Sequence, residues 1–263
     1  MESNNHNNTE EYPPDFSEAY DKCLWRFAIN AAPQIYDLYL QEEFKGEYQN
    51  RLLDLCCGPG HLSHFFLERG FFTTGIDLSE TMLQLARERS KEYENQSEWI
   101  LADASHFDLG KHFGLVVSTF SSLNLLPSLE QLTKCFQSVY KHLEKGGTFI
   151  FDMTTRLGAE YHNNVFFRDM GDYTIITNGY FNKEGCKASL HFLGFFKTDD
   201  SSCYKKFEHH QVETLYKITD VEIALKETGF NDIQYYVYGI TGVQAIPEPE
   251  NVVNVIVKTR KCV

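Results

Sequence analysis

The sequence lacks the features that mark secreted, disulfide-stabilised or membrane-spanning proteins. Its seven cysteines are an odd number, with no CxxC pair, so we expect neither a disulfide framework nor a structural metal site. The first eleven residues have neither the basic nor the apolar region of a signal peptide. No apolar run reaches the length of a transmembrane helix. These absences predict a cytoplasmic protein that does not act at a membrane.

Positive charge is also scarce. The chain has 24 Lys and Arg against 37 Asp and Glu, a formal net charge of −13. An acidic surface repels phosphate backbones, and the pair Lys205-Lys206 is too short to form a basic patch. We therefore expect no nucleic-acid partner. The composition does not indicate an oligomeric state.

Strands and helices are predicted to alternate through the first half of the chain. Apolar runs predict strands at residues 51–55, 71–77, 98–102, 113–120 and 148–153. Helices are expected between them, one from 61 to 69, one capped by Ser79, and one opened by Ser128 and Gln131 and ended by Gly146-Gly147. This alternation favours a parallel sheet with helices on both faces.

The flanking segments follow other patterns. Residues 17–43 are helical in pattern, with Pro33 predicted to divide them into two helices. Residues 163–216 show short strands and turn signals, which predict an antiparallel meander. Thr219 and Glu222 then form a capping box for a helix closed by Gly229, and strands follow at 233–238 and 252–259.

These patterns predict a single α/β domain with an inserted antiparallel sheet. The expected parts are a disordered tail (1–14), cap helices (15–50), an α/β core (51–160), the inserted sheet (161–216) and a return to the core (217–263).

The segment from Asp54 to Gly60 predicts a cofactor site. A strand ends there, the chain turns on Gly58 and Gly60, and a helix begins. Glycine allows a ligand to approach the backbone closely, and the helix amides face that ligand. Asp77 ends the next strand, where an acid suits a ribose diol. Because residues 58–63 are close to GxGxxG, these features alone leave a nicotinamide-dependent oxidoreductase open.

Asp103, at the end of the third strand, adds an acceptor for an adenine amine. With it, the ordered motifs resemble those of class I S-adenosylmethionine (SAM) dependent methyltransferases. The motifs are Leu52–Gly60, Gly75–Ser79, Ala102-Asp103, Phe113–Leu126 and Gly146–Asp152. The resemblance implies a Rossmann-like α/β fold with a seven-stranded sheet whose last strand is antiparallel.

The chain is most similar to the bacterial small-molecule subgroup, which carries a β-sheet lid after strand five. Tyr20-Asp21-Lys22 resembles the N-terminal segment of that subgroup, and residues 207–230 resemble its return from lid to helix. Two positions depart from the pattern. Cys56 replaces the first glycine of the turn, and Thr214 stands where related lids often carry Arg.

The resemblance also implies a role for individual residues. The methionine part of SAM would contact Asp54, Cys56, Gly58 and Gly60, and Asp77 would hold the ribose. Leu78 and Met82 would flank the adenine, Asp103 would bind its amine, and Ala104 would offer a backbone amide. Ser118 and Thr119 would open toward the sulfonium, and Tyr20 would close over the cofactor, which leaves as S-adenosylhomocysteine (SAH).

The methyl acceptor is predicted by exclusion. Strand four is followed by Ser121–Asn124, not by the (Asp/Asn)-Pro-Pro-(Tyr/Phe) segment typical of nucleobase and glutamine amide methyltransferases, nor by a Pro-Cys pair. We therefore expect transfer to an oxygen or nitrogen of a small molecule, in specialised metabolism. A noncatalytic SAM-binding protein remains an alternative.

A general base is needed only if the acceptor loses a proton as it attacks. His209 and His210 are the candidates, and strand alternation places them on opposite faces of the lid. Asp152 either points into the site or caps a turn. Aromatic residues of the lid predict an acceptor that is apolar or aromatic in part; they are Phe166, Phe167, Tyr180, Phe181, Phe192, Phe195 and Phe196.

Overall fold

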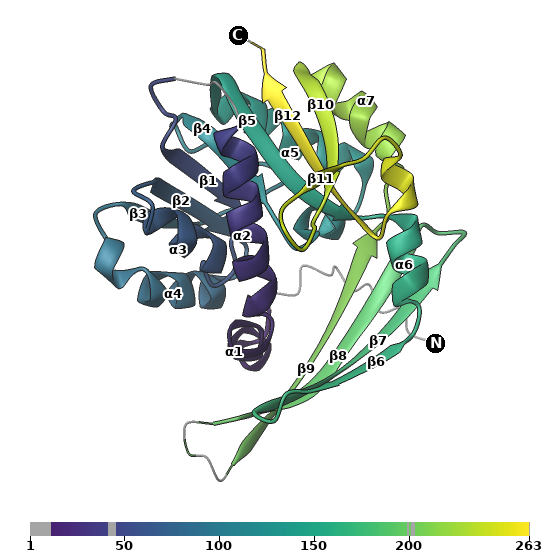
Figure 1. Ribbon diagram of the computed structural model, residues 1–263. Helices are drawn as coiled ribbons and strands as arrows, with labels where there is room; N and C mark the ends of the chain where they lie inside the picture. The colour runs from purple at the N-terminus through teal and green to yellow at the C-terminus, as the bar shows by residue number, and fades with distance from the viewer. Residues whose placement is uncertain (1–11, 42–45, 199, 201–202, 263) are drawn as a thin grey trace, which may run out of the picture.

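The computed structural model describes residues 12–41, 46–198, 200 and 203–262. Two sheets dominate it: a large, mostly parallel sheet, and a four-stranded antiparallel sheet that projects from it (Figure 1). Among the described residues, no helix has the length and apolar character needed to cross a membrane.

The main sheet confirms the predicted class I architecture. Its strands run in the order β11 (Gln244–Ala245), β10 (Phe230–Val237), β12 (Asn254–Lys261), β5 (Leu143–Thr154), β4 (Phe113–Ser118), β1 (Arg51–Leu55), β2 (Phe72–Asp77) and β3 (Ser97–Leu101). Strand β12 pairs antiparallel with both β5 and β10. The two-residue β11 is an edge addition to the seven expected strands. Because β1 to β5 are parallel, their carboxyl ends lie along one edge, where ligands of such sheets bind.

Helices cover both faces of this sheet. On one face, α5 (Leu129–His142) and α7 (Ile218–Thr228) pack on a cluster that includes Leu53 and Val116. On the other, α2 (Trp25–Leu40) and α3 (His61–Leu67) pack on Leu52 and Leu115. Helix α4 (Glu80–Arg89) packs against Trp99 of β3. Consecutive side chains of β1 and β4 thus point to opposite faces of the sheet, and both faces are buried under helices, as is typical of a parallel sheet.

The N-terminal helices differ from the prediction. The break lies at Leu24, between α1 (Pro14–Cys23) and α2, and Pro33 lies inside α2. Burial of Ala32 and Ile35 holds α2 on the core on both sides of the proline, and this packing outweighs the lost backbone hydrogen bond. Of the predicted disordered tail, residues 1–11 lie outside the described part, whereas Tyr12 packs on Phe16 with ring centroids 5.3 Å apart.

Two predicted helix boundaries also need correction. The capping box of Thr219 and Glu222 does not form, because α7 begins at Ile218, whose N–H donates to Glu250 Oε1 at 2.6 Å. Helix α5 ends at His142, before the glycines expected to end it, and β5 begins at Leu143. By contrast, Gly229 ends α7 in the left-handed conformation (φ 111°), as expected.

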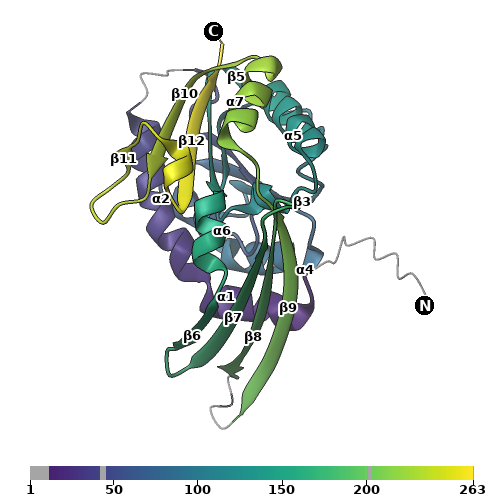
Figure 2. The same ribbon diagram turned by 90° about the vertical axis from the view of Figure 1, so that its right-hand side faces the viewer.

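The second sheet, called the lid below, is the predicted meander. Its strands are β6 (Val165–Asp169), β7 (Tyr173–Asn182), β8 (Lys187–Lys197) and β9 (Tyr204–Thr214), paired antiparallel in that order. Helix α6 (Arg156–His162) leads into it. The turned view shows α1 against the strands of the lid (Figure 2), and Phe16 and Ala19 of α1 pack with Phe196 and Phe207 of the lid. Helix α1 therefore lies between the lid and the carboxyl edge of the main sheet.

Candidate functional site

The glycine turn joins β1 to α3 at the carboxyl edge of the sheet. Gly58 and Gly60 have φ of 53° and 75°. A Cβ on Gly60 would lie 3.0 Å from both Ala86 and the Trp99 ring, so the turn is also closely packed. Cys56 has φ 55°, in the left-handed region that favours glycine. The cysteine found in place of the usual glycine is therefore held in a strained conformation.

Two buried acids flank this turn. The Asp54 carboxylate accepts a hydrogen bond from Ser63 Oγ at 2.7 Å. The Asp77 carboxylate accepts from the N–H groups of Gly58 and Ser79, both at 2.9 Å. Burial raises the pKa of Asp54 to about 7 and also raises that of Asp77. No Lys, Arg or His within the described ranges forms an ion pair with either acid, so both favour a cationic or hydrogen-donating ligand.

The residues expected around the adenine gather where β2 and β3 end side by side, since Asp77 pairs with Leu101. Leu78 is 56% exposed and Met82 is buried. Asp103 is exposed, and its Oδ1 accepts from the Ser105 N–H at 2.7 Å. Ala104 is buried. Asp103 thus closes a local turn, and its second carboxylate oxygen forms no bond to the described residues that would prevent contact with a ligand.

The loop after β4 completes the edge. Ser118 is buried, and its Oγ has no hydrogen-bond partner among the described residues. Phe120 and Ser121 have φ of 63° and 55°. Their N–H groups donate to the Asp152 carboxylate at 3.2 and 2.5 Å, and Tyr238 donates its hydroxyl at 2.7 Å. Burial raises the pKa of Asp152 to about 6. This acid therefore braces the strained loop and does not cap a turn of its own.

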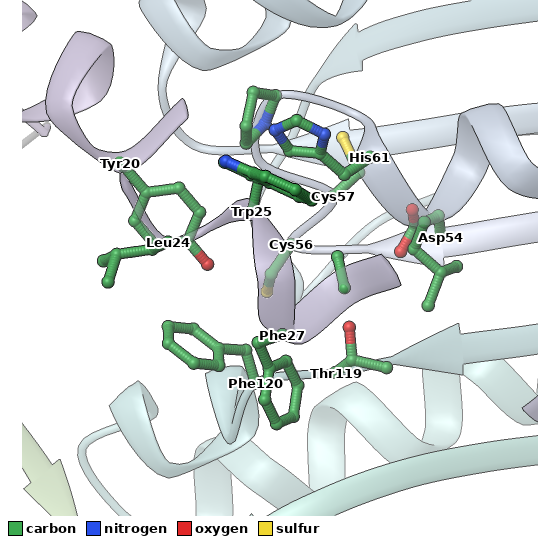
Figure 3. A pocket seen from close by; sticks show the side chains of 13 residues that line it. Tyr20, Leu24, Trp25, Phe27, Asp54, Cys56, Cys57, His61, Thr119 and Phe120 are labelled. Atoms are coloured by element: carbon green, nitrogen blue, oxygen red, sulfur yellow. The ribbon is translucent and has the colours of Figure 1, made fainter. Parts of the chain in front are cut away.

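Helices α1 and α2 cover the glycine turn. A small cavity lies between them and the carboxyl ends of β1 and β4 (Figure 3). Tyr20 forms one side of it, and Phe120 and Thr119 form another. A Cβ on Gly58 would lie 3.9 Å from the Tyr20 ring, and the Tyr20 and Phe120 ring centroids are 5.7 Å apart. The helix is anchored by Asp21, which lies 2.8 Å from His61 and pairs with Arg89. His61, at the start of α3, thus lies beside the cover.

The two lid histidines lie on opposite faces of the lid, as predicted, and they differ in burial. His209 is buried on the inner face and stacks on Phe16, with centroids 4.1 Å apart. Burial lowers its pKa to about 4. His210 is exposed on the outer face, where it stacks on His191 at 4.0 Å. This placement removes His210 from the candidate bases.

The aromatic residues of the lid are also divided between its faces. Phe167, Tyr180 and Phe195 are exposed. Phe192 and Phe196 point inward but pack with helix α1, and Phe181 packs on Ala159 of α6. Most of the inward aromatic surface therefore packs against α1 and α6.

Sequence reasoning missed Glu213 and Tyr12. Glu213 is buried on the inner face of the lid, four residues from His209 on β9, and it accepts from Gln211 Nε2 at 3.0 Å. Strand alternation from His209 could have indicated this placement. Thr214, where related lids often carry Arg, interacts with a lysine: its hydroxyl accepts a hydrogen bond from Lys187 Nζ at 2.6 Å. Tyr12 lies in the predicted tail, which offered no signal.

Comparisons with known proteins agree with this geometry. Residues 52–147 match the model of a methyltransferase domain family. The dTDP-3-amino-3,4,6-trideoxy-α-D-glucopyranose N,N-dimethyltransferase of Streptomyces venezuelae is 27% identical over 236 residues, covering 88% of this chain and 96% of that protein. A SAM-dependent methyltransferase from Clostridium acetobutylicum has the same fold, with a TM-score of 0.77, 22% identity, and coverage of 94% and 98% of the two chains.

A third similar protein is a SAM-bound amino pentose methyltransferase from Micromonospora echinaspora. It has a TM-score of 0.70 and 19% identity, and the alignment covers 96% of this chain and 98% of that one. Residues 52–147 therefore form a methyltransferase domain, in a chain that has the fold of SAM-dependent methyltransferases. The comparisons give no support to the oxidoreductase alternative.

Proposed function

We propose that this enzyme transfers the methyl group of SAM to an oxygen or nitrogen of a small molecule. The observation that carries the proposal is the pair of buried acids, Asp54 and Asp77, that flank the glycine turn without a cationic partner among the described residues. SAM brings an ammonium and a sulfonium group, and nearby positive charge favours the ionised form of these acids. The orphaned Ser118 hydroxyl lies at the same edge.

We assign the cofactor contacts accordingly. Asp54, Cys56, Gly58 and Gly60 hold the methionine part, and Asp77 holds the ribose through the free lone pairs of its oxygens. The adenine lies between Leu78 and Met82, with its amine at Asp103 and a ring nitrogen at the Ala104 amide. Ser118 faces the sulfonium, and Tyr20 covers it. In this proposal, residues 51–160 bind the cofactor and residues 161–216 cover the acceptor.

Bound SAM supplies an activated methyl group, so the protein chiefly has to position the acceptor and exclude water. Helices α1 and α2 provide the cover, and the Asp152 brace fixes the loop beside the reacting centre. His209 remains a candidate acceptor contact on the inner face, where its lowered pKa keeps the imidazole neutral. The relatives that act on aminosugars favour a small acceptor. We propose one that is apolar in part, from specialised metabolism.

Two measurements test this function. SAH is expected to raise the melting temperature of the protein, whereas NADH is not, because a ligand of the native state stabilises it. Incubation with labelled SAM and a metabolite extract is expected to yield a labelled small molecule. Binding of SAH with no transfer in any extract would instead indicate a noncatalytic SAM-binding protein.

The ribose assignment has its own test. The Asp77→Ala variant is expected to weaken SAH binding by at least about tenfold, since it loses hydrogen bonds made by a charged group, worth about 1.5–3 kcal/mol. Isothermal titration calorimetry measures this directly. An unchanged affinity would show that the ribose lies elsewhere.

A further inference from the structure

The inner face of the lid carries an acid that the cofactor assignment does not use. Along β9, burial alternates so that Phe207, His209 and Glu213 face α1 and the core, while Glu208 and His210 face outward. Glu213 is only 6% exposed. Its side chain thus lies on the face of the lid that packs toward α1 and the core.

Glu213 has no cationic partner among the residues that the structure describes. Its one side-chain hydrogen bond comes from the neutral amide of Gln211, at 3.0 Å. A buried carboxylate without a cation is costly, and burial raises the pKa of Glu213 to about 7. Such a group is suited to hold a cationic ligand and to exchange a proton with it near neutral pH.

The end of β9 is fastened to the cofactor edge of the core. Asn124, in the helical turn after β4, donates its side-chain amide to the Thr214 carbonyl at 2.9 Å and to the Thr154 carbonyl at 3.1 Å. Thr154 ends β5, two residues after Asp152. Glu213, next to Thr214, therefore lies where the lid meets the carboxyl ends of β4 and β5.

Tyr12 relates Glu213 to the glycine turn. Burial raises the pKa of the Tyr12 phenol, and the nearby charges of Asp77, Cys56 and Glu213 raise it further. The Tyr12 ring lies 4.9 Å from the ring of His209, which is on the same face of β9 as Glu213, and 6.3 Å from the ring of Tyr20, which covers the glycine turn. Tyr12 therefore packs beside both the inner face of the lid and the cover of the glycine turn.

We propose that Glu213 binds the methyl acceptor and that the acceptor is an amine. This inference rests on the proposed function. An aliphatic amine is an ammonium ion in neutral water, and a buried carboxylate attracts this positive charge. A hydroxyl acceptor carries no such charge. Glu213 accepts one proton from the ammonium, and the freed lone pair attacks the methyl carbon. The carbon–sulfur bond breaks with its electrons on sulfur, giving SAH and an N-methylammonium product.

The test uses SAM labelled with ¹³C in the methyl group, a metabolite extract of the source organism, and the full-length protein. The Glu213→Gln variant keeps the shape of the side chain and removes its charge. Glu208→Gln, on the outer face of the same strand, is the matched control. Glu213→Asp keeps the charge on a shorter side chain. NMR of the product distinguishes methyl groups on nitrogen, oxygen and carbon, and calorimetry measures SAH affinity for each variant.

The expected result is an N-methyl product from the wild type and Glu208→Gln. Glu213→Gln should form it about 100-fold more slowly or worse, with SAH affinity within about twofold of wild type, and Glu213→Asp should be intermediate. An O- or C-methyl product, or full activity of Glu213→Gln, overturns the amine assignment while the methyltransferase function stands. SAH binding without any transfer overturns the proposed function itself. If Glu213→Gln loses SAH binding, the activity of Glu213→Asp decides: any rate clearly above that of Glu213→Gln supports a charge role, and a rate as low as that of Glu213→Gln overturns it.

Discussion

The unpaired acids at the cofactor edge should make the ligand-free enzyme less stable as the pH rises. Asp54 is the clearest case, since it is 2% exposed and burial raises its pKa from 3.8 to about 7. The folded state therefore binds the proton more tightly than the unfolded chain. The resulting stabilisation is fully present below pH 3.8 and is lost as the pH rises through about 7.

The magnitude follows from these two values. A tenfold change in proton affinity is worth 1.36 kcal/mol, so the whole difference is about 4 kcal/mol. Of this, about 2–3 kcal/mol is lost between pH 5 and pH 8. For a chain of this size, that loss corresponds to a melting temperature roughly 5–10 °C lower at pH 8 than at pH 5.

The Asp54→Asn variant isolates this effect. Asparagine can still accept the hydrogen bond from Ser63 Oγ but does not ionise. Differential scanning fluorimetry of the ligand-free protein from pH 5 to pH 8 should show a fall that is smaller in Asp54→Asn by about this amount. Asp37→Asn, an exposed change on α2, is the control and should follow the wild type. Identical pH dependence in Asp54→Asn and wild type would refute the reasoning.

Two further substitutions test the packing and strain of the cofactor turn. In Gly75→Ala, the new Cβ would lie 2.4 Å from the Trp99 ring and 2.8 Å from Cys57 Sγ. Urea denaturation should therefore show a free energy of unfolding lower by about 1–3 kcal/mol. The double variant with Trp99→Leu should recover part of this free energy, and no recovery would mean that the strain does not come from the Trp99 contact. In Cys56→Gly, relief of the left-handed residue, about 1–2 kcal/mol, exceeds the added entropy of the unfolded chain, about 0.4–1 kcal/mol. Urea denaturation should therefore show a gain of about 0.5–1 kcal/mol, and a loss would mean that contacts of the Cys56 side chain outweigh its strain.

The main sheet could be predicted because each of its signals is local. Runs such as Leu115-Val116-Val117 identify strands buried on both faces, and their alternation with helices fixes the parallel order. The acids Asp54 and Asp77 were found for a related reason: residues at the ends of parallel strands meet at one edge, wherever they lie in the sequence. Gly229 was predicted correctly because a glycine that ends a helix is recognised from its immediate neighbours in the sequence.

The errors arose where a distant residue decides the outcome. Glu250 binds the first turn of α7 across 32 residues and displaces the expected capping box. Burial of Ile35 against the core keeps α2 helical through Pro33. The alternation of β9 correctly separated His209 from His210, but it could not say which face meets α1. Nor could it show that the inner face continues to a buried Glu213, which has no cationic partner in the described part of the chain.

Helix α1 couples the lid to the cofactor edge, and its packing matters more than its ion pairs. Lys205 of β9 lies 2.8 Å from both Asp15 and Glu18, and Asp21 pairs with Arg89 on the other side. The pairs of Lys205 are exposed and contribute about 0–1 kcal/mol each. Burial of Phe16 alone, at 2% exposure between α1 and the lid, contributes about 2–3 kcal/mol. The aromatic face of the lid therefore secures the helix that carries Tyr20 over the glycine turn, which leaves the polar end of β9, at Gln211 and Glu213, to meet the acceptor.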